Sequence, residues 1–324
     1  MTSSSLPVIC LAPLRGLTDA IFRNTYACFF SGVDWSVTPF LTTIQGSRIK
    51  PSHVKEVWPE NNQRMPIVPQ IISKSAANFI ALAKVLFDLG YESLNWNLGC
   101  PFPMVAKKKR GSGLLPYPDL VDAFLNETLA QIPNRLSIKM RLGRYRAEEI
   151  DALWPILNRY PLSQIIIHPR TGVQMYDGYP DEEAFARCLT KSDHAVIYNG
   201  DITTRAVYKR LQARFPKVNT WMIGRGLLAD PFLPARIKGI EPPPADPMVR
   251  LRQFHHALYA QYAEVLCGPA SLVNRMKGFW LYFCRWFQDG KHILNQIHKT
   301  RRADRYEALV ERILTECACW QPGD

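Results

Sequence analysis

The sequence predicts an α/β protein, a (β/α)8 TIM barrel followed by a small all-helical domain. Short β-rich runs alternate with helix-like segments from residue 7 to about 240. Several of these runs are continuously apolar, which is typical of parallel strands covered on both faces. Beyond residue 247 the pattern is helical throughout. An open doubly wound sheet is disfavoured because no G-x-G-x-x-G follows the first strand.

Eight segments of the first 240 residues are predicted strands. They are Pro7–Leu14, Asp34–Phe40, Pro66–Ser73, Ser93–Cys100, Leu136–Leu142, Gln164–Arg170, Ala195–Gly200 and Thr220–Gly226. Between them, Ser75–Leu89 and Pro118–Gln131 carry apolar residues at helical spacing. Eight β-α units in about 230 residues is the usual size of a TIM barrel.

A proline-rich stretch at residues 241–247 ends this alternation, since it suits a stiff extended connector and not a helix. Four helices are predicted after it, at Met248–Leu266, Pro269–Phe287, Lys291–Thr300 and Asp304–Cys317. We therefore divide the chain into a barrel domain, residues 1–240, and a helical domain, residues 241–324.

Composition narrows the class of protein. The 324 residues carry a net charge of +12, which favours a polyanionic partner, either nucleic acid or an anionic membrane. No apolar window approaches the roughly 18 residues of a membrane span, and no secretory signal is visible. Eight scattered cysteines without a C-x-x-C pair indicate reduced thiols and no metal site. We expect a cytoplasmic monomer without a membrane or protein partner.

In a TIM barrel the loops after the strands build the active site. The last two predicted strands end in Asn199-Gly200-Asp201 and Gly224-Arg225-Gly226. Glycines there let backbone N–H groups approach a phosphate, and an arginine adds a charge-assisted contact. The alternative is a pair of ordinary turns with a surface arginine. Both turns at these positions favour a ligand with a terminal phosphate.

Three further polar residues lie in or after predicted strands. Lys139 and Gln70 stand in strands otherwise suited to burial, where a lysine needs an anion or an electron-rich ring. The N1–C2=O edge of a reduced flavin fits Lys139, and the amide of Gln70 could bind the same ring. His168 could donate to a phosphate or a carbonyl. The alternatives are side chains pointing outward and a satisfied core histidine.

Cys100 lies between Gly99 and Pro101 at the end of the fourth strand. A thiol with an ordinary pKa near 8.5 keeps its proton at neutral pH and can deliver it to a carbanion. A nucleophilic role and a role as a small buried apolar group remain open.

Taken together, these strand ends resemble the dihydrouridine synthase family. The matching motifs are A-P-L-x-G at 12–16, N-L-G-C-P at 97–101, K-x-R-x-G at 139–143, H-P-R-T at 168–171, N-G-D-I at 199–202 and G-R-G at 224–226. Arg275-Met276-Lys277 adds a match in the helical domain. The resemblance spans most of the chain and keeps the order of the motifs.

The resemblance implies a barrel that binds FMN and uses NADPH to reduce uridines in tRNA. Flavin hydride would go to C6 of uracil, and Cys100 would protonate C5. Asn97 matches a residue that holds the flipped base, and Arg141 matches a position on the substrate side. The residues that match the family's flavin contacts are Ala12, Pro13, Leu14, Gln70, Lys139, His168, Asn199, Gly200, Asp201, Gly224 and Arg225.

The predicted RNA contacts are basic residues. Arg275 and Lys277 lead a basic stretch of the helical domain that includes Arg285, and residues 107–110 form a basic loop after Cys100. The helical domain is most similar to the bacterial subgroup that acts at position 16 of the tRNA D-loop. Two departures from the family, Asn95 for an acid and Pro169 for a glycine, bear on RNA choice. Ribosomal RNA, a small-molecule flavin substrate and a non-catalytic RNA-binding barrel remain alternatives.

Overall fold

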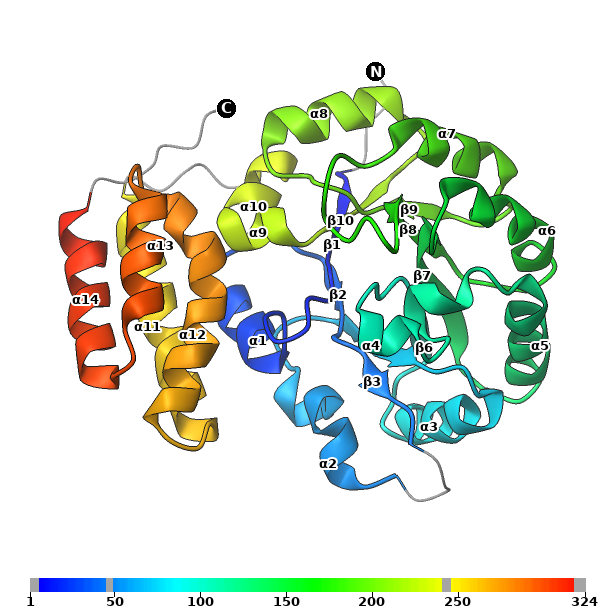
Figure 1. The fold of residues 1–324 in the computed structure, drawn as a ribbon, viewed down its shortest axis with the longest axis horizontal. Coiled ribbons are helices and arrows are strands. Elements are labelled where there is room, and N and C mark those ends of the chain that lie inside the picture. The colour runs from blue at the N-terminus through cyan, green and yellow to red at the C-terminus, as the bar shows by residue number, and fades with distance from the viewer. Residues whose placement is uncertain (1–5, 45–48, 241–245, 318–324) are drawn as a thin grey trace.

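A computed structural model describes residues 6–44, 49–240 and 246–317. Within these residues ten parallel strands form one curved sheet with helices outside it (Figure 1). The strands are β1 (Val8–Leu11), β2 (Trp35–Val37), β3 (Leu41–Thr42), β4 (Ile67–Val68), β5 (Gln70–Ile72), β6 (Ser93–Leu98), β7 (Arg135–Gly143), β8 (Ile165–Thr171), β9 (Val196–Tyr198) and β10 (Thr220–Ile223).

The ten strands make up eight strands of a closed barrel. β10 pairs with β1, and β1 pairs with β2, so the last strand meets the first. β2 pairs with β4 and β3 with β5, and β5 continues the sheet to β6. Pro69 alone separates β4 from β5, and it has no N–H to donate to a ladder. β2–β3 and β4–β5 are therefore two interrupted barrel strands, and the predicted TIM barrel is confirmed.

The helices of the barrel cover its outer face. α3 begins after Ser75, whose side chain accepts from the N–H of Asn78, and α5 begins with Pro118 at its first position. Both residue types are common where helices begin. The barrel helices are α1 (Ala20–Phe29), α2 (Pro51–Val54), α3 (Ala76–Asp88), α4 (Pro103–Ala106), α5 (Pro118–Leu129), α6 (Trp154–Leu157), α7 (Glu182–Lys191), α8 (Arg205–Arg214), α9 (Arg225–Ala229) and α10 (Leu233–Lys238).

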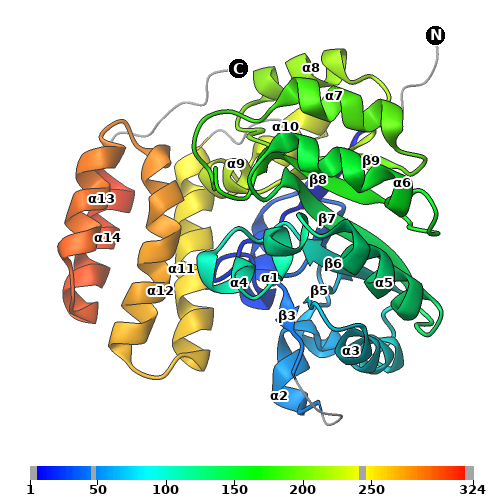
Figure 2. The same ribbon diagram turned by 45° about the vertical axis from the view of Figure 1, so that its right-hand side comes forward.

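Four helices follow the barrel and lie to one side of it in both views (Figures 1 and 2). The first two of them pack on α1, where the ring of Phe22 stacks on Phe279 at 5.7 Å and meets Phe254 edge-on at 6.0 Å. The apolar core thus runs from the barrel into these helices without a break. The helices are α11 (Pro247–Val265), α12 (Pro269–Phe283), α13 (Gly290–Lys299) and α14 (Ala303–Glu316).

The predicted helical segment is confirmed, and each helix begins within one residue of its predicted start. The predicted connector falls largely on residues 241–245, outside the described residues, and the domain boundary at residue 240 stays a prediction. Several strands end earlier than predicted. β1 stops at Leu11 and β6 at Leu98, because the motif residues that follow form loops at the mouth of the barrel.

Candidate active site

A cavity of about 610 Å³ opens at the carboxyl ends of the barrel strands. It collects residues from loops far apart in the sequence, as a TIM-barrel active site does. The predicted cofactor-binding residues that line it are Ala12, Pro13, Leu14, Lys139, His168, Asn199, Gly200, Asp201, Gly224 and Arg225. The eleventh, Gln70, lies in the barrel interior and is fully buried.

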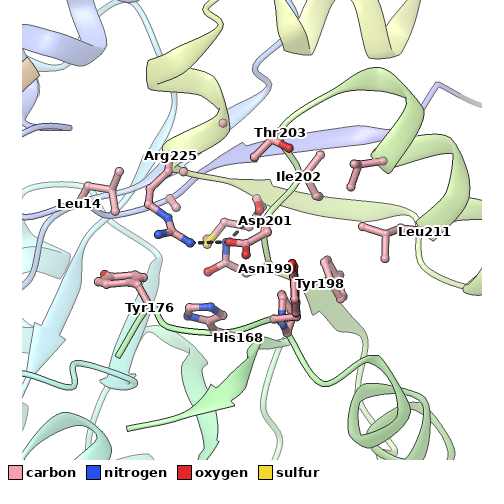
Figure 3. Close-up of a pocket in the computed structure, with 18 of the residues that line it drawn as sticks. Leu14, His168, Tyr176, Tyr198, Asn199, Asp201, Ile202, Thr203, Leu211 and Arg225 are labelled. Carbon is pink, nitrogen blue, oxygen red and sulfur yellow. Dashed lines mark hydrogen bonds and ion pairs between the residues drawn. The ribbon is translucent and has the colours of Figure 1, made fainter. Parts of the chain in front are cut away.

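The turns after β9 and β10 form one wall of the cavity. Nη2 of Arg225 lies 2.5 Å from Oδ1 of Asp201, a contact that Figure 3 shows beside Asn199. Asp201 has a φ of +39°, in the left-handed region that asparagine and aspartate tolerate best among side-chain residues. A Cβ on Gly224 would lie 3.2 Å from the Cβ of Ala12, so the glycine keeps this wall open. The wall suits an anionic group.

Arg170, on β8, determines which ring nitrogen of His168 carries the proton. The guanidinium is 1% exposed and donates to Nε2 of His168 at 3.0 Å. It also binds both carboxylate oxygens of Asp201, at 3.1 and 2.5 Å. An arginine only donates, so Nε2 of His168 must accept and the ring proton resides on Nδ1. Burial, with Arg141 and Lys139 nearby, holds the pKa of His168 well below its usual value. His168 is therefore a neutral donor through Nδ1.

The amino group of Lys139 has no carboxylate partner among the described residues. Its side chain lines the cavity, and among the described residues its Nζ has no hydrogen-bond acceptor. Burial and the charge of Arg141 lower the pKa of Lys139 to about 7. The charge of such a half-buried lysine is unfavourable until a ligand with negative charge or high electron density contacts it.

The pattern of the sequence did not point to Tyr176, and it did not place Arg285 at this cavity. Tyr176 lines the cavity, and its ring lies 5.4 Å from the guanidinium of Arg141 and 4.6 Å from that of Arg225. Arg285 reaches the same cavity from the segment after α12. The helical segment thus contributes a cation to the barrel's cavity, a contact that sequence spacing cannot reveal.

A chain of buried amides runs from the barrel interior to Cys100. Nδ2 of Asn95 donates to Oγ of Ser137, and Nε2 of Gln70 donates to Oδ1 of Asn95, both at 2.8 Å. Nδ2 of Asn97 donates to Oε1 of Gln70 at 2.7 Å. Oδ1 of Asn97 then accepts from the backbone N–H of Cys100 at 2.8 Å. Gln70 and Asn97 therefore help to fix the backbone of Cys100.

Cys100 is 8% exposed, and burial raises the pKa of its thiol, although a backbone hydrogen bond from Phe102 and the charges of Arg15, Arg141 and Lys139 oppose this. The thiol thus keeps its proton at neutral pH. Gly111, with a φ of +56°, packs directly on it: a Cβ there would lie 2.7 Å from the carbonyl oxygen of Cys100. The N–H of Ser112 donates to the same oxygen at 3.0 Å.

The predicted substrate-side residues have structural partners. Arg141 donates to the carbonyl of Gly99 at 3.1 Å and to that of Thr171 at 2.7 Å. Arg275 donates to the carbonyl of Gly16 at 2.8 Å and to Asp19 at 3.1 Å, so it links α12 to the loop after β1.

Lys277 donates to the carbonyl of His298 at 3.2 Å, within the helical segment. Its role in RNA binding stays a prediction, as do those of Arg275 and Arg141.

Relatives of known family match this chain over most of its length. The profile of the family "Dihydrouridine synthase (Dus)" matches residues 10–313. A probable tRNA-dihydrouridine synthase of Rhodobacter capsulatus is 30% identical over 245 residues, 74% of each chain. A tRNA-dihydrouridine(16) synthase of Aquipseudomonas alcaligenes is 26% identical over 320 residues, 93% of this chain and 98% of the relative.

Solved structures share the fold. A morphinone reductase mutant in complex with tetrahydroNAD superposes with a TM-score of 0.53 at 12% identity, covering 76% of this chain and 91% of the other. The old yellow enzyme of Trypanosoma cruzi gives 0.51 at 12% identity, with 72% and 88% covered. At this level of identity the likeness concerns the fold alone. The family profile, which spans nearly the whole chain, shows that this protein belongs to the dihydrouridine synthase family.

Proposed function

We propose that this protein reduces the C5=C6 bond of a uridine in the D-arm of tRNA to 5,6-dihydrouridine, with FMN as its cofactor and NADPH as the reductant. The observation that carries the proposal is that Lys139, half-buried and without a hydrogen-bond acceptor among the described residues, lines the cavity close enough to the buried, protonated Cys100 for its charge to influence that thiol. The names of the relatives, including synthases for position 16, support tRNA as the substrate.

The residues of the cavity fit a flavin mononucleotide. Arg225 and the turns at Gly200 and Gly224 suit its terminal phosphate. Lys139 suits the N1–C2=O edge of the ring, where reduction places negative charge. Nδ1 of His168 offers a neutral donor to a ring or ribityl oxygen. When bound, the reduced flavin supplies a hydride for C6 of the uracil.

The chain's own residues supply the proton and the position. Transfer of a hydride to C6 leaves a carbanion at C5 that is conjugated with the C4 carbonyl, and the S–H of Cys100 donates its proton to C5. The thiolate that results lies near Arg15, Arg141 and Lys139, whose charges favour it. Asn97 fixes the backbone of Cys100, and we propose that it also holds the flipped base.

Arg285 supports a role for the helical segment beside the cofactor. Its side chain lines the cavity although it lies after α12. We propose that residues 241–324 form an RNA-binding domain whose Arg275 and Lys277 contact the tRNA backbone. Such contacts orient the RNA without reading its sequence.

The test is to map dihydrouridine in RNA from cells that lack the gene, and then to restore it with the purified protein, FMN and NADPH. Loss of dihydrouridine at a D-loop position of tRNA is expected. If dihydrouridine is unchanged in tRNA but lost from ribosomal RNA, the substrate is ribosomal RNA and the proposal of tRNA is wrong. A purified protein that takes up no FMN would overturn it.

A further inference from the structure

Four apolar side chains stand out into solvent around the mouth of the barrel. Their exposed fractions are 51% for Phe102, 82% for Met104, 63% for Tyr145 and 51% for Val173. They come from the loops after three neighbouring strands, β6, β7 and β8. We call these four residues the mouth surface. Apolar groups gathered on a water-facing surface mark a site of interaction more often than chance.

Arg144 shows that the three loops form one continuous surface. Its Nη1 donates to the carbonyl of Pro101, which precedes Phe102, at 2.9 Å. Its own carbonyl accepts from the N–H of Val173, also at 2.9 Å. Tyr145 is the next residue in the chain. The loops of the mouth surface are thus joined through one residue, and Phe102 lies two positions after Cys100.

Basic side chains lie among the four residues of the mouth surface. The guanidinium of Arg144 lies 5.8 Å from the centroid of the Tyr145 ring. Lys107, Lys108 and Arg146 are exposed in the same two loops. Of the acids in the three loops, Glu149 is turned to the backbone N–H groups of residues 144–146, whereas Glu148 and Asp177 are exposed, so the exposed cations outnumber the exposed carboxylates. The positive charge complements a phosphate backbone.

Aromatic and thioether groups among cations are the combination that binds unpaired nucleotides. Bases stack on the apolar groups, and the phosphates lie against the cations. A protein partner of ordinary kind would bury a surface depleted of charge at its centre, unlike this one. Extruding a uridine also exposes the faces of its neighbours, which need a new stacking partner.

We propose that the mouth surface, Phe102, Met104, Tyr145 and Val173, stacks the unpaired bases that flank the target uridine. This rests on the proposed function for the identity of the RNA. The surface holds the distorted strand open, while the basic residues beside it bind the backbone.

The experiment compares Tyr145→Ser and Phe102→Ser with Phe87→Ser, an exposed aromatic control on α3. The holoenzyme is titrated into an unmodified tRNA transcript at several salt concentrations. We expect the affinity to fall about tenfold for each mouth variant and to stay unchanged for Phe87→Ser. The slope of log Kd against log salt should stay the same, because no phosphate contact is lost, whereas Lys107→Gln should reduce it by about one.

A second readout uses the same RNA with 2-aminopurine beside the target uridine. Its fluorescence should change on binding to the wild-type protein and to Phe87→Ser, and much less with the mouth variants. Wild-type affinity and fluorescence in both mouth variants would overturn the proposal. Dihydrouridine formed by the wild type is measured in parallel, and its absence would count against the proposed function alone.

Discussion

The charge of Lys139 should destabilise the cofactor-free protein, and Lys139→Met tests this. Burial and Arg141 lower its pKa from 10.5 to about 7. At about 1.4 kcal/mol for each pH unit this corresponds to about 5 kcal/mol. The side chain keeps some access to cavity water, which screens the charge, so we expect a gain of about 2–3 kcal/mol for the methionine variant.

The sign of the pH dependence follows from the lowered pKa. Below pH 7 the folded wild type carries the buried charge and the cost is complete. Between pH 7 and 10.5 the folded lysine is neutral while the unfolded one stays protonated, so wild-type stability rises with pH. The advantage of Lys139→Met should therefore be full at pH 6 and small near pH 10.

Urea unfolding of the flavin-free proteins at pH 6 and pH 9.5 measures the difference, with the exposed Lys84→Met as the control. The Lys139 variant should also bind flavin about 10- to 100-fold more weakly, since a charged hydrogen bond is lost. Equal destabilisation of the variant at both pH values would refute the argument, because the charge would then have had a partner.

Three further substitutions probe the site. Cys100→Ala should keep flavin and NADPH oxidation but lose about 100-fold or more of dihydrouridine formation, and wild-type product yield would remove the thiol from the reaction. Gly111→Ala should also lose dihydrouridine formation, because its Cβ would press on Cys100. Gly90→Ala is the control: its φ is +93° and a Cβ there would meet open space, so the variant should lose stability without a change in product yield. In Arg170→Gln the ring proton of His168 should no longer be confined to Nδ1, and the ¹⁵N chemical shifts of the imidazole should change. An unchanged Nδ1–H form would contradict the role given to Arg170.

The barrel was predictable because local patterns encode it. Continuous apolar runs mark its parallel strands, and polar residues at their ends mark the mouth. The same kind of reasoning could have predicted that the ring proton of His168 resides on Nδ1. His168 and Arg170 alternate on one strand and so share a face. The sequence alone leaves their partners unassigned, because Asp201 belongs to the next loop.

Contacts set by register and by tertiary packing were beyond the sequence. Gln70 was expected at the flavin, and the pairing of Gln70 with Asn95 across β5 and β6 depends on a register that one sequence does not reveal. Arg285 was counted among the basic residues of the helical segment, and the packing of α12 on the barrel places it at the cavity. Arg144, which joins the loops of the mouth, carried no motif at all.

The amides behind Cys100 all point the same way. Each amide donates a hydrogen bond on the side of Ser137 and accepts one on the side of Cys100, and the hydroxyl of Ser137 donates to the carbonyl of Leu94. A carboxylate in place of Asn95 could accept but not donate, so the hydroxyl of Ser137 would have to turn around. Hydrogen bonds from the barrel interior thus help to set the position of the Cys100 sulfur. A substitution in this chain of amides would therefore affect the reaction without changing any loop residue.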